Sequence, residues 1–264
     1  VLVVDDRQAP VDVEASVGGT GAADEARFRI GGIASGWRVA VGDPRGLPQV
    51  TPSEACAFGP YFAACLVAGE VFKRLSGLRE GRGRFITSLQ MSLWDWQERE
   101  CWAELADGDW PQTGELPPLY LIGAGAVGQG TAAALAASRP LRGLVTVIDG
   151  DQIDAQGTNL NRYPLATGAE LGAPKAKLLV QHLLRAGFQA YSDDRHWPAY
   201  AHDPPSARPS AELGSLEADY RYRLVLSCVD KNPARHAVQN FWPEYVIGGS
   251  TSDMALSVAA YDMR

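Results

Sequence analysis

The feature that most constrains the fold is a glycine-rich loop between two apolar runs. The first run, Leu119 to Ile122, leads directly into Gly123-Ala-Gly-Ala-Val-Gly128, and a helix pattern follows over residues 131–138. Glycines spaced as G-x-G-x-x-G after a strand allow a tight turn and close backbone approach, and the following helix offers unpaired N–H groups to phosphate oxygens. The pattern predicts a nucleotide-binding βαβ unit whose loop glycines are Gly123, Gly125 and Gly128.

The second apolar run, Leu144 to Ile148, ends in the acidic turn Asp149-Gly-Asp151. An acid that closes the second strand about 20 residues after the glycines can accept a hydrogen bond from a ribose hydroxyl, and Asp149 has that position. Two other interpretations stay open here: a dehydrogenase, and a glycine turn in an α/β sheet that binds no nucleotide. Strand, glycines, helix and acid fall in register, which favours a nucleotide site over the second of these.

The polar segment after this turn is unlike that of a dehydrogenase. It supplies an acid, an amide and two cations: Asp151, Asn159, Arg162 and Lys175. A hydride-transfer site has no need of such a cluster. Cleavage of ATP between its α- and β-phosphates builds negative charge, which Arg and Lys neutralise while a carboxylate holds magnesium. The segment therefore predicts ATP and Mg²⁺ as cofactors.

A third strand pattern, Arg223 to Ser227, leads through Cys228 to Asp230. In a parallel sheet this places one more carboxylate at the carboxyl edge, where open α/β sheets bind their ligands. Asp230 is therefore expected at the ligand-binding edge of the sheet.

Five separated motifs, in this order, resemble the ubiquitin-activating-enzyme-like adenylating family, which includes the ThiF and MoeB sulfur-carrier-activating enzymes. They are Gly123-Ala-Gly-Ala-Val-Gly, Asp149-Gly-Asp, Asn159-Leu-Asn-Arg, Leu171-Gly-Ala-Pro-Lys-Ala-Lys and Val229-Asp-Lys-Asn-Pro-Ala-Arg. The resemblance covers about Leu119 to Asp262 and implies an α/β, Rossmann-like and mostly parallel sheet. The chain departs from the family pattern at three residues. Ala126 adds one methyl group to a turn and is expected to be tolerated, whereas Tyr163 and Lys231 affect details of the magnesium shell and the substrate approach but not the class.

The resemblance implies a role for each matching residue. Gly123, Gly125 and Gly128 form the nucleotide loop, Asp151 contacts the ribose together with Asp149, Asn159 contacts the phosphates with Arg162 and Lys175, and Asp230 contacts magnesium and the adenylate. Catalysis is assigned to Arg162, Lys175 and Asp230. The segment from Ile247 to Thr251 resembles the one near which the substrate's C-terminal tail enters.

The activity implied is adenylation of the C-terminal carboxylate of a ubiquitin-like or sulfur-carrier protein that ends in glycine, giving an acyl-adenylate and pyrophosphate. The resemblance extends to bacterial activators in ubiquitin-like operons, some used in antiviral defence, and allows a conjugating-enzyme-like partner and a homodimer. Two alternatives stay open: an adenylating enzyme acting on a small peptide or a modified tRNA, and a non-catalytic scaffold with an adenylation fold.

Composition narrows the class further. A formal net charge of −7 argues against a general nucleic-acid binder, because phosphate affinity needs a basic face. Apolar runs stay below the about 18 residues of a membrane span, and no signal-peptide layout precedes them, so a cytoplasmic enzyme without membrane contact is expected. Cys65 and Cys228 are expected to be buried core thiols. A chain that begins at Val1 and stops at Arg264 is interpreted as part of a longer protein, with any thioester cysteine outside it.

The composition changes near Gln112, which we take as a domain boundary. Residues 113–264 form the expected ATP-binding adenylation domain, truncated at its C-terminal end. Residues 1–112 have no glycine fingerprint and no Asn-x-x-Arg. Their helix pattern over 60–75, between strand patterns over 33–41 and 85–93, resembles the late crossover helix of the family.

Residues 1–112 are therefore expected to be a degenerate, inactive adenylation-like half, with an unrelated packing domain as the alternative. Arg27 and Arg29 are candidates for an arginine beside the γ-phosphate. The Pro-rich stretch over 193–219 is expected to be a long insertion.

Overall fold

The computed structural model describes residues 13–18, 26–51, 56–77, 85–111, 114–202, 222–252 and 255–262. Contacts divide the chain into two compact units, Val1–Pro111 and Gln112–Arg264, referred to below as unit 1 and unit 2. Of the insertion expected over 193–219, residues 203–219 lie outside the described residues.

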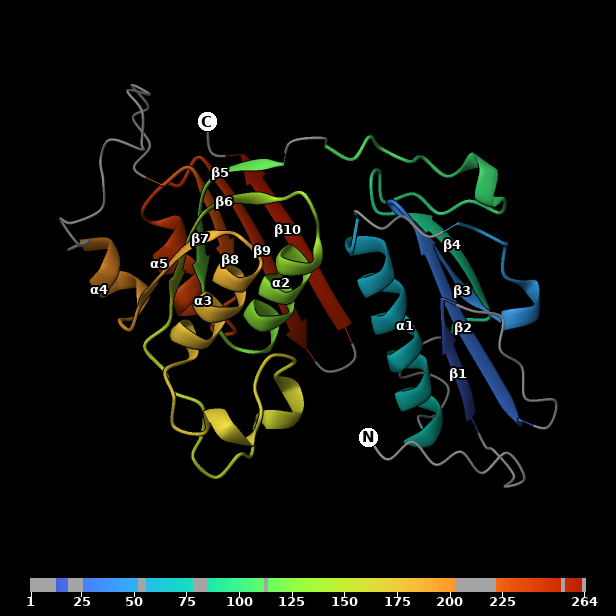
Figure 1. The fold of residues 1–264 in the computed structure, drawn as a ribbon, viewed down its shortest axis with the longest axis horizontal. Coiled ribbons are helices and arrows are strands. Elements are labelled where there is room, and N and C mark those ends of the chain that lie inside the picture. Colours follow the sequence, from blue (N-terminus) through green and yellow to red (C-terminus); the bar gives the residue numbers. More distant parts are fainter. Residues whose placement is uncertain are drawn as a thin grey trace. The chain divides into compact units, whose positions relative to one another are not determined.

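Unit 1 is a four-stranded sheet with one long helix along it (Figure 1). Its elements are β1 (Val13–Val17), β2 (Phe28–Ser35), β3 (Arg38–Gly42), η1 (Pro44–Gly46), α1 (Phe58–Leu75), β4 (Ser88–Ser92) and η2 (Trp102–Glu104). Strands β1 and β2 are parallel, and the β2/β3 and β3/β4 pairs are antiparallel. Helix α1 packs on the sheet through a core that includes Ile30, Val39 and Val67. A Cβ at Gly32 would lie 2.8 Å from Val67 Cγ2, so the glycine lets the helix approach closely.

The single strand expected over residues 33–41 is wrong. The chain reverses there, so that β2 and β3 form a hairpin in which Ser35 pairs with Arg38. Gly36, at the turn, has a φ of +60°, a left-handed conformation that glycine adopts without steric cost. The apolar residues on both sides of Gly36 therefore belong to two strands of one core.

The helix expected over 60–75 is confirmed as α1, but its buried face differs from the expected one. Residues Gly59, Ala63, Val67 and Glu70 face the core. This stripe is rotated from the expected one, so Cys65 is exposed and the prediction of a buried thiol at that position is wrong. The sheet accepts small residues at close approach, whereas the helical spacing in the sequence predicts a buried stripe of Phe62, Cys65, Leu66, Gly69 and Phe72.

Unit 2 is a six-stranded sheet in the order β10-β9-β8-β5-β6-β7, parallel except for the β9/β10 pair. Its elements are β5 (Glu115–Ile122), α2 (Ala126–Ala137), β6 (Arg142–Ile148), η3 (Leu160–Arg162), η4 (Gly168–Glu170), α3 (Lys175–Arg185), β7 (Gln189–Asp193), α4 (Trp197–His202), β8 (Leu224–Ser227), α5 (Asn232–Gln239), β9 (Tyr245–Ser252) and β10 (Ala255–Asp262). The expected α/β fold with a Rossmann-like, mostly parallel sheet is confirmed.

The strand order of unit 2 reverses between two central strands. From β5 the chain proceeds to β6 and β7 on one side, and then returns to β8 and β9 on the other (Figure 1). Ligands of open α/β sheets bind at such a switch point, beyond the carboxyl ends of the strands. The residues that follow β5, β6 and β8 are therefore those that the fold brings to one edge.

Alternate residues of β5 pack on opposite faces of this sheet. Tyr120 belongs to a core cluster with Trp197 of α4 and Val238 of α5. Leu121, fully buried, lies on the other face, and its Cδ2 would be 3.3 Å from a Cβ at Gly128 of α2. Helices thus cover both faces of the sheet, as a buried parallel sheet requires.

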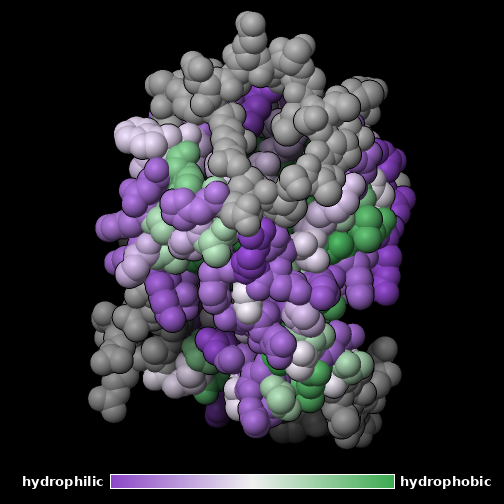
Figure 2. All heavy atoms as spheres, turned by 90° about the vertical axis from the view of Figure 1, so that its left-hand side faces the viewer, coloured by the Kyte–Doolittle hydropathy of each residue, from purple (hydrophilic) through white to green (hydrophobic). Residues whose placement is uncertain are grey.

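The surface of unit 2 on the side that carries α4 is mainly hydrophilic, with apolar groups in separate patches (Figure 2). Among the helices of the described residues, none combines the length and apolar character needed to cross a membrane.

Candidate functional site

The glycine loop joins β5 to α2, and each glycine has a distinct environment. Gly123 has a φ of +93°, and a Cβ there would lie 3.0 Å from the carbonyl oxygen of Cys228. A Cβ at Gly128 would lie 2.0 Å from the carbonyl oxygen of Gly123, so the loop folds directly onto the first turn of the helix. Gly125 is the N-cap of α2, and a Cβ at this position would meet no atom within 4 Å. Two glycines are thus required by the loop itself, and the third leaves open space at the helix N-terminus.

Asp149 braces this loop from the end of β6. Its Oδ2 accepts a hydrogen bond of 2.6 Å from the N–H of Ala124, and its Oδ1 accepts one of 2.8 Å from the N–H of Asp151. Both carboxylate oxygens of Asp149 therefore hold backbone N–H groups, one in the glycine loop and one in the turn after β6. Asp151, by contrast, keeps 59% of its side chain exposed.

Lys175 is fixed beside Asp151 by two contacts. Its Nζ lies 3.0 Å from Asp151 Oδ2, and its backbone N–H donates to the carbonyl oxygen of Asp151 at 3.0 Å. The Nζ also lies 5.8 Å from the ring centroid of Tyr163. Burial by itself would lower the pKa of Lys175, but the hydrogen bond to Asp151 and the charges of Asp149 and Asp151 outweigh it and raise the pKa above 10.5. Lys175 is therefore a cation held in place at neutral pH.

Asn159 and Arg162 lie together in the loop between β6 and α3. The Nη2 of Arg162 donates a hydrogen bond to Oδ1 of Asn159. The turn before them is held by Asp154, which accepts hydrogen bonds from the hydroxyl and the N–H of Thr158, and these bonds lower its pKa. The sequence interpretation had no role for Asp154, although an aspartate followed by a turn of this kind is a recognisable local signal.

Gln129 ties this loop to the glycine loop, and the sequence interpretation also missed it. The side chain is fully buried in α2, and its Oε1 accepts a hydrogen bond of 3.1 Å from the N–H of Leu165. The loop that carries Arg162 is thereby anchored to the helix that begins at the glycine loop. A buried amide on a helix has no sequence signature, because its partner is distant in the chain.

Asp230 follows β8 on the other side of the glycine loop. It is exposed, and the preceding residue Val229 lies against Gly123, with Cγ1 3.2 Å from a Cβ position there. Within the described part of the chain, no three His, Cys, Asp or Glu side chains form a group that could hold a metal ion. Mg²⁺ usually takes one or two carboxylates together with substrate phosphates, so the exposed carboxylate of Asp230 fits a metal that arrives with a nucleotide.

Cys228 is half-buried, so the expected buried thiol is confirmed only in part. Burial raises the pKa of its thiol to about 11, only partly offset by the hydroxyl of Thr131, so the group stays protonated and unreactive at neutral pH.

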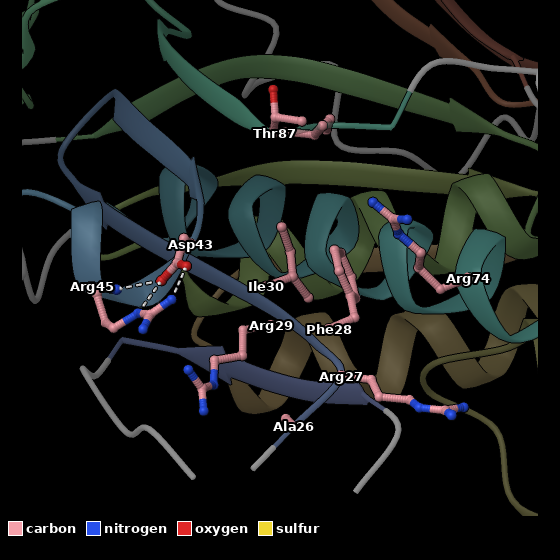
Figure 3. Close-up of a pocket in the computed structure, with 10 residues that line it drawn as sticks. Ala26, Arg27, Phe28, Arg29, Ile30, Asp43, Arg45, Arg74 and Thr87 are labelled. Carbon is pink, nitrogen blue, oxygen red and sulfur yellow. Dashed lines mark hydrogen bonds and ion pairs between the residues drawn. The ribbon is translucent and has the colours of Figure 1, made fainter. Parts of the chain in front are cut away.

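The arginine candidates of unit 1 line a pocket of about 300 Å³ (Figure 3). Arg29 lies on β2 with 10% of its side chain exposed, and its Nε is 3.3 Å from Oε2 of Glu14 on β1. Arg27 lines the same pocket. Asp43 there has its pKa lowered to about 2, mainly by its hydrogen bonds with Arg45. Arg29 is therefore engaged in an ion pair within unit 1.

The fold and the glycine loop place unit 2 in the class of Rossmann-like α/β domains, with polar groups from several loops at one edge of the sheet. Residues 118–252, just over half of the chain, match the model of the ThiF family. The chain belongs to the ThiF family.

Comparisons with whole proteins cover only parts of them. A protein of Sinorhizobium fredii, described as the uncharacterized protein y4jF, is 24% identical over 214 residues, which are 81% of this chain and 38% of that protein. Escherichia coli MccB with MccA-N7isoASN is 20% identical over 50% of this chain and 35% of that one, with a TM-score of 0.38. The E. coli tRNA N6-threonylcarbamoyladenosine dehydratase TcdA is 22% identical over 51% of each chain, with a TM-score of 0.36. The chain thus spans about a third to a half of the length of these proteins.

Proposed function

We propose that unit 2 binds ATP with Mg²⁺ and transfers its adenylyl group to a carboxylate. The observation that carries this proposal is the Lys175–Asp151 pair, with an Nζ to Oδ2 distance of 3.0 Å, at the sheet edge that also holds the glycine loop. A fixed cation whose pKa is raised, at the same sheet edge as a helix N-terminus with open space at Gly125, is suited to a polyphosphate. Membership of the ThiF family supports the same assignment.

Each site residue has a proposed role. The phosphates lie against Gly125 and the N-terminus of α2, with Lys175, Arg162 and Asn159 around them. The ribose faces Asp151, beside Asp149, whose oxygens already hold the backbone. Asp230 holds Mg²⁺, which arrives with the nucleotide phosphates.

The proposed reaction needs positioning and charge neutralisation more than proton transfer. A carboxylate is already ionised at neutral pH, so its oxygen attacks the α-phosphorus without a general base. The bond from the α-phosphorus to the bridging oxygen breaks, and pyrophosphate leaves with the electron pair. Arg162 and Lys175 neutralise the charge that develops on the phosphate oxygens, a contribution that is large in a fixed site.

We further propose that the carboxylate is the C-terminal glycine of a ubiquitin-like or sulfur-carrier protein. The segment from Ile247 to Thr251, near which the resemblance implies that the substrate's C-terminal tail enters, lies in β9, and its Gly249 faces α2. A Cβ at Gly249 would lie 3.2 Å from Cγ1 of Val127, in the first turn of that helix.

Unit 1 is proposed to be the inactive companion of unit 2. Its sheet is antiparallel except for the β1/β2 pair, and its described residues contain no glycine loop of the kind found after β5. A sheet without a parallel switch point lacks the crevice in which a nucleotide binds. Unit 1 is therefore assigned no part in nucleotide binding.

Exchange of radiolabelled pyrophosphate into ATP tests the function. The probes are a peptide that ends in Gly-Gly with a free carboxylate, and the same peptide as its C-terminal amide. Exchange is expected with the carboxylate and not with the amide, and Asp230→Ala should lower it about a hundredfold. Exchange that requires tRNA, or a peptide without the glycine tail, would select the alternative substrates, and ATP binding without any exchange would indicate a scaffold.

A further inference from the structure

The imidazole of His196 lies flat against the turn that separates the two acids after β6. A Cβ built on Gly150 would be 2.9 Å from Cε1, 3.0 Å from Nδ1 and 3.0 Å from Nε2 of His196. Nearly equal distances to three atoms of one ring mean that the ring packs face-on over the glycine. Only a residue without a side chain between Asp149 and Asp151 leaves room for it.

The backbone that carries His196 is anchored on both sides. Arg195 makes a two-pronged contact with Asp193, with Nε to Oδ1 and Nη2 to Oδ2 both at 2.9 Å. Asp193 also accepts, through its carbonyl oxygen, a hydrogen bond of 3.1 Å from the N–H of Asp149. On the other side, Trp197 is 4% exposed and its Nε1 donates to the carbonyl oxygen of Ala237 at 3.2 Å. The backbone that carries the His196 ring is therefore fixed beside Asp149 and Asp151.

His196 is exposed, and its ring nitrogens make no hydrogen bond to any of the residues that the structure describes. The planar ring of His196 is thus held at the carboxyl edge between β6 and β7. It contacts Gly150, whose neighbours in the chain are Asp149 and Asp151, the residue that faces the ribose in the proposed function. The base of a nucleotide whose ribose lies at Asp151 can extend from the ribose toward β7. On that side it would meet the flat face of the His196 ring.

We propose that His196 forms the wall of a base-binding subsite and stacks on the purine ring of the nucleotide. This inference rests on the proposed function of unit 2 and specifies which part of the nucleotide the region beyond β6 contacts. Histidine stacks on bases as other aromatic side chains do, and the interaction grows with the overlapping ring area. The subsite therefore favours purine over pyrimidine nucleotides, and Gly150 is required because its missing side chain seats the imidazole.

Titration calorimetry of the full chain with ATP and with CTP tests whether His196 stacks on the base. His196→Ala is expected to weaken ATP binding about tenfold, with a smaller loss for CTP, and His196→Phe is expected to retain most of the ATP affinity. His202→Ala, at the exposed end of α4, is the matched control and should bind ATP as the unsubstituted chain does. ATP binding by His196→Ala that equals the unsubstituted chain would overturn the proposal, as would an equal loss in the Ala and Phe variants.

A double-mutant cycle tests whether Gly150 positions the His196 ring. Gly150→Ala is expected to weaken ATP binding about as much as His196→Ala, because its methyl group displaces the ring. In the His196→Ala background the same change should have little further effect, since nothing then occupies the space. Independent, additive losses would overturn the pairing of these two residues. If the unsubstituted chain binds no nucleoside triphosphate, the proposed function itself is rejected. Melting temperatures of all variants identify those that fail to fold.

Discussion

Asp149 and Ala124 are joined by a hydrogen bond of 2.6 Å from the backbone N–H of Ala124 to Oδ2 of Asp149. The bond ties the glycine loop after β5 to the end of β6, and the other carboxylate oxygen holds the N–H of Asp151 at 2.8 Å. An acid predicted for ligand contact is therefore also a structural brace. Asp151, two residues further along the chain, is exposed and pairs with Lys175 rather than holding the loop backbone through its side chain.

The first prediction separates these two acids. Asp149→Ala should lower the free energy of unfolding by about 1 to 3 kcal/mol, because it leaves two backbone donors without an acceptor. Asp151→Ala should change stability little and weaken ATP binding more. Chemical denaturation and calorimetry of both variants provide the comparison. Equal stability losses in the two would show that Asp149 is not a brace.

The second prediction concerns the pH dependence contributed by Lys175. Its pKa in the folded chain is raised above 10.5, so its stabilising contribution is present below that unfolded value and is lost as pH rises through the folded pKa. The stability difference between the unsubstituted chain and Lys175→Met should therefore stay constant from pH 7 to about 10 and shrink above it. Denaturant unfolding over this range measures it. A difference that grows with pH would contradict the assigned shift.

The third prediction compares two glycines of one loop. Gly128→Ala should destabilise unit 2 by about 1 to 3 kcal/mol or displace the loop, because its Cβ would lie 2.0 Å from the carbonyl oxygen of Gly123. Gly125→Ala meets no atom within 4 Å and should fold normally, while its methyl group enters the space proposed for phosphate. Thermal unfolding and ATP binding distinguish the two. Normal stability of Gly128→Ala would show that the loop can relax.

The fourth prediction concerns the choice of nucleotide. ATP should bind more tightly than NAD, because the fixed Lys175 and the Arg162–Asn159 pair suit a triphosphate. Calorimetry with each nucleotide and Mg²⁺ measures the difference, and Arg162→Ala should reduce it. Tighter binding of NAD than of ATP would favour the dehydrogenase interpretation.

The fifth prediction tests Arg29. Its ion pair with Glu14 is largely buried, so Arg29→Ala should destabilise unit 1 by leaving a buried carboxylate without that partner. The double variant Arg29→Ala with Glu14→Ala should recover part of the loss. If the pyrophosphate exchange rate falls in Arg29→Ala while stability is unchanged, the arginine acts on the nucleotide instead.

Local patterns account for the parts of this protein that sequence alone determined. Glycine spacing, the apolar runs and the order of acids and cations predicted a helix after the glycine loop, the strands β5, β6 and β8, and the class of unit 2. The helix was expected over residues 131–138, but it begins at Ala126. These features depend on backbone conformation and on side-chain periodicity within a few residues. For the same reason, α1 was found at nearly its observed length.

Tertiary structure decided which side chains meet. The buried face of α1 was misjudged because close packing on Gly32 favours Ala63 and Val67 over larger neighbours. The hairpin at Gly36 divided one expected strand, since a glycine in the left-handed conformation leaves the apolar pattern on both sides intact. The bracing of Ala124 by Asp149, the anchoring of Leu165 by Gln129 and the seating of His196 on Gly150 each join distant parts of the chain. No local pattern encodes such pairs, because they arise only when the parallel strands bring their carboxyl ends to one edge.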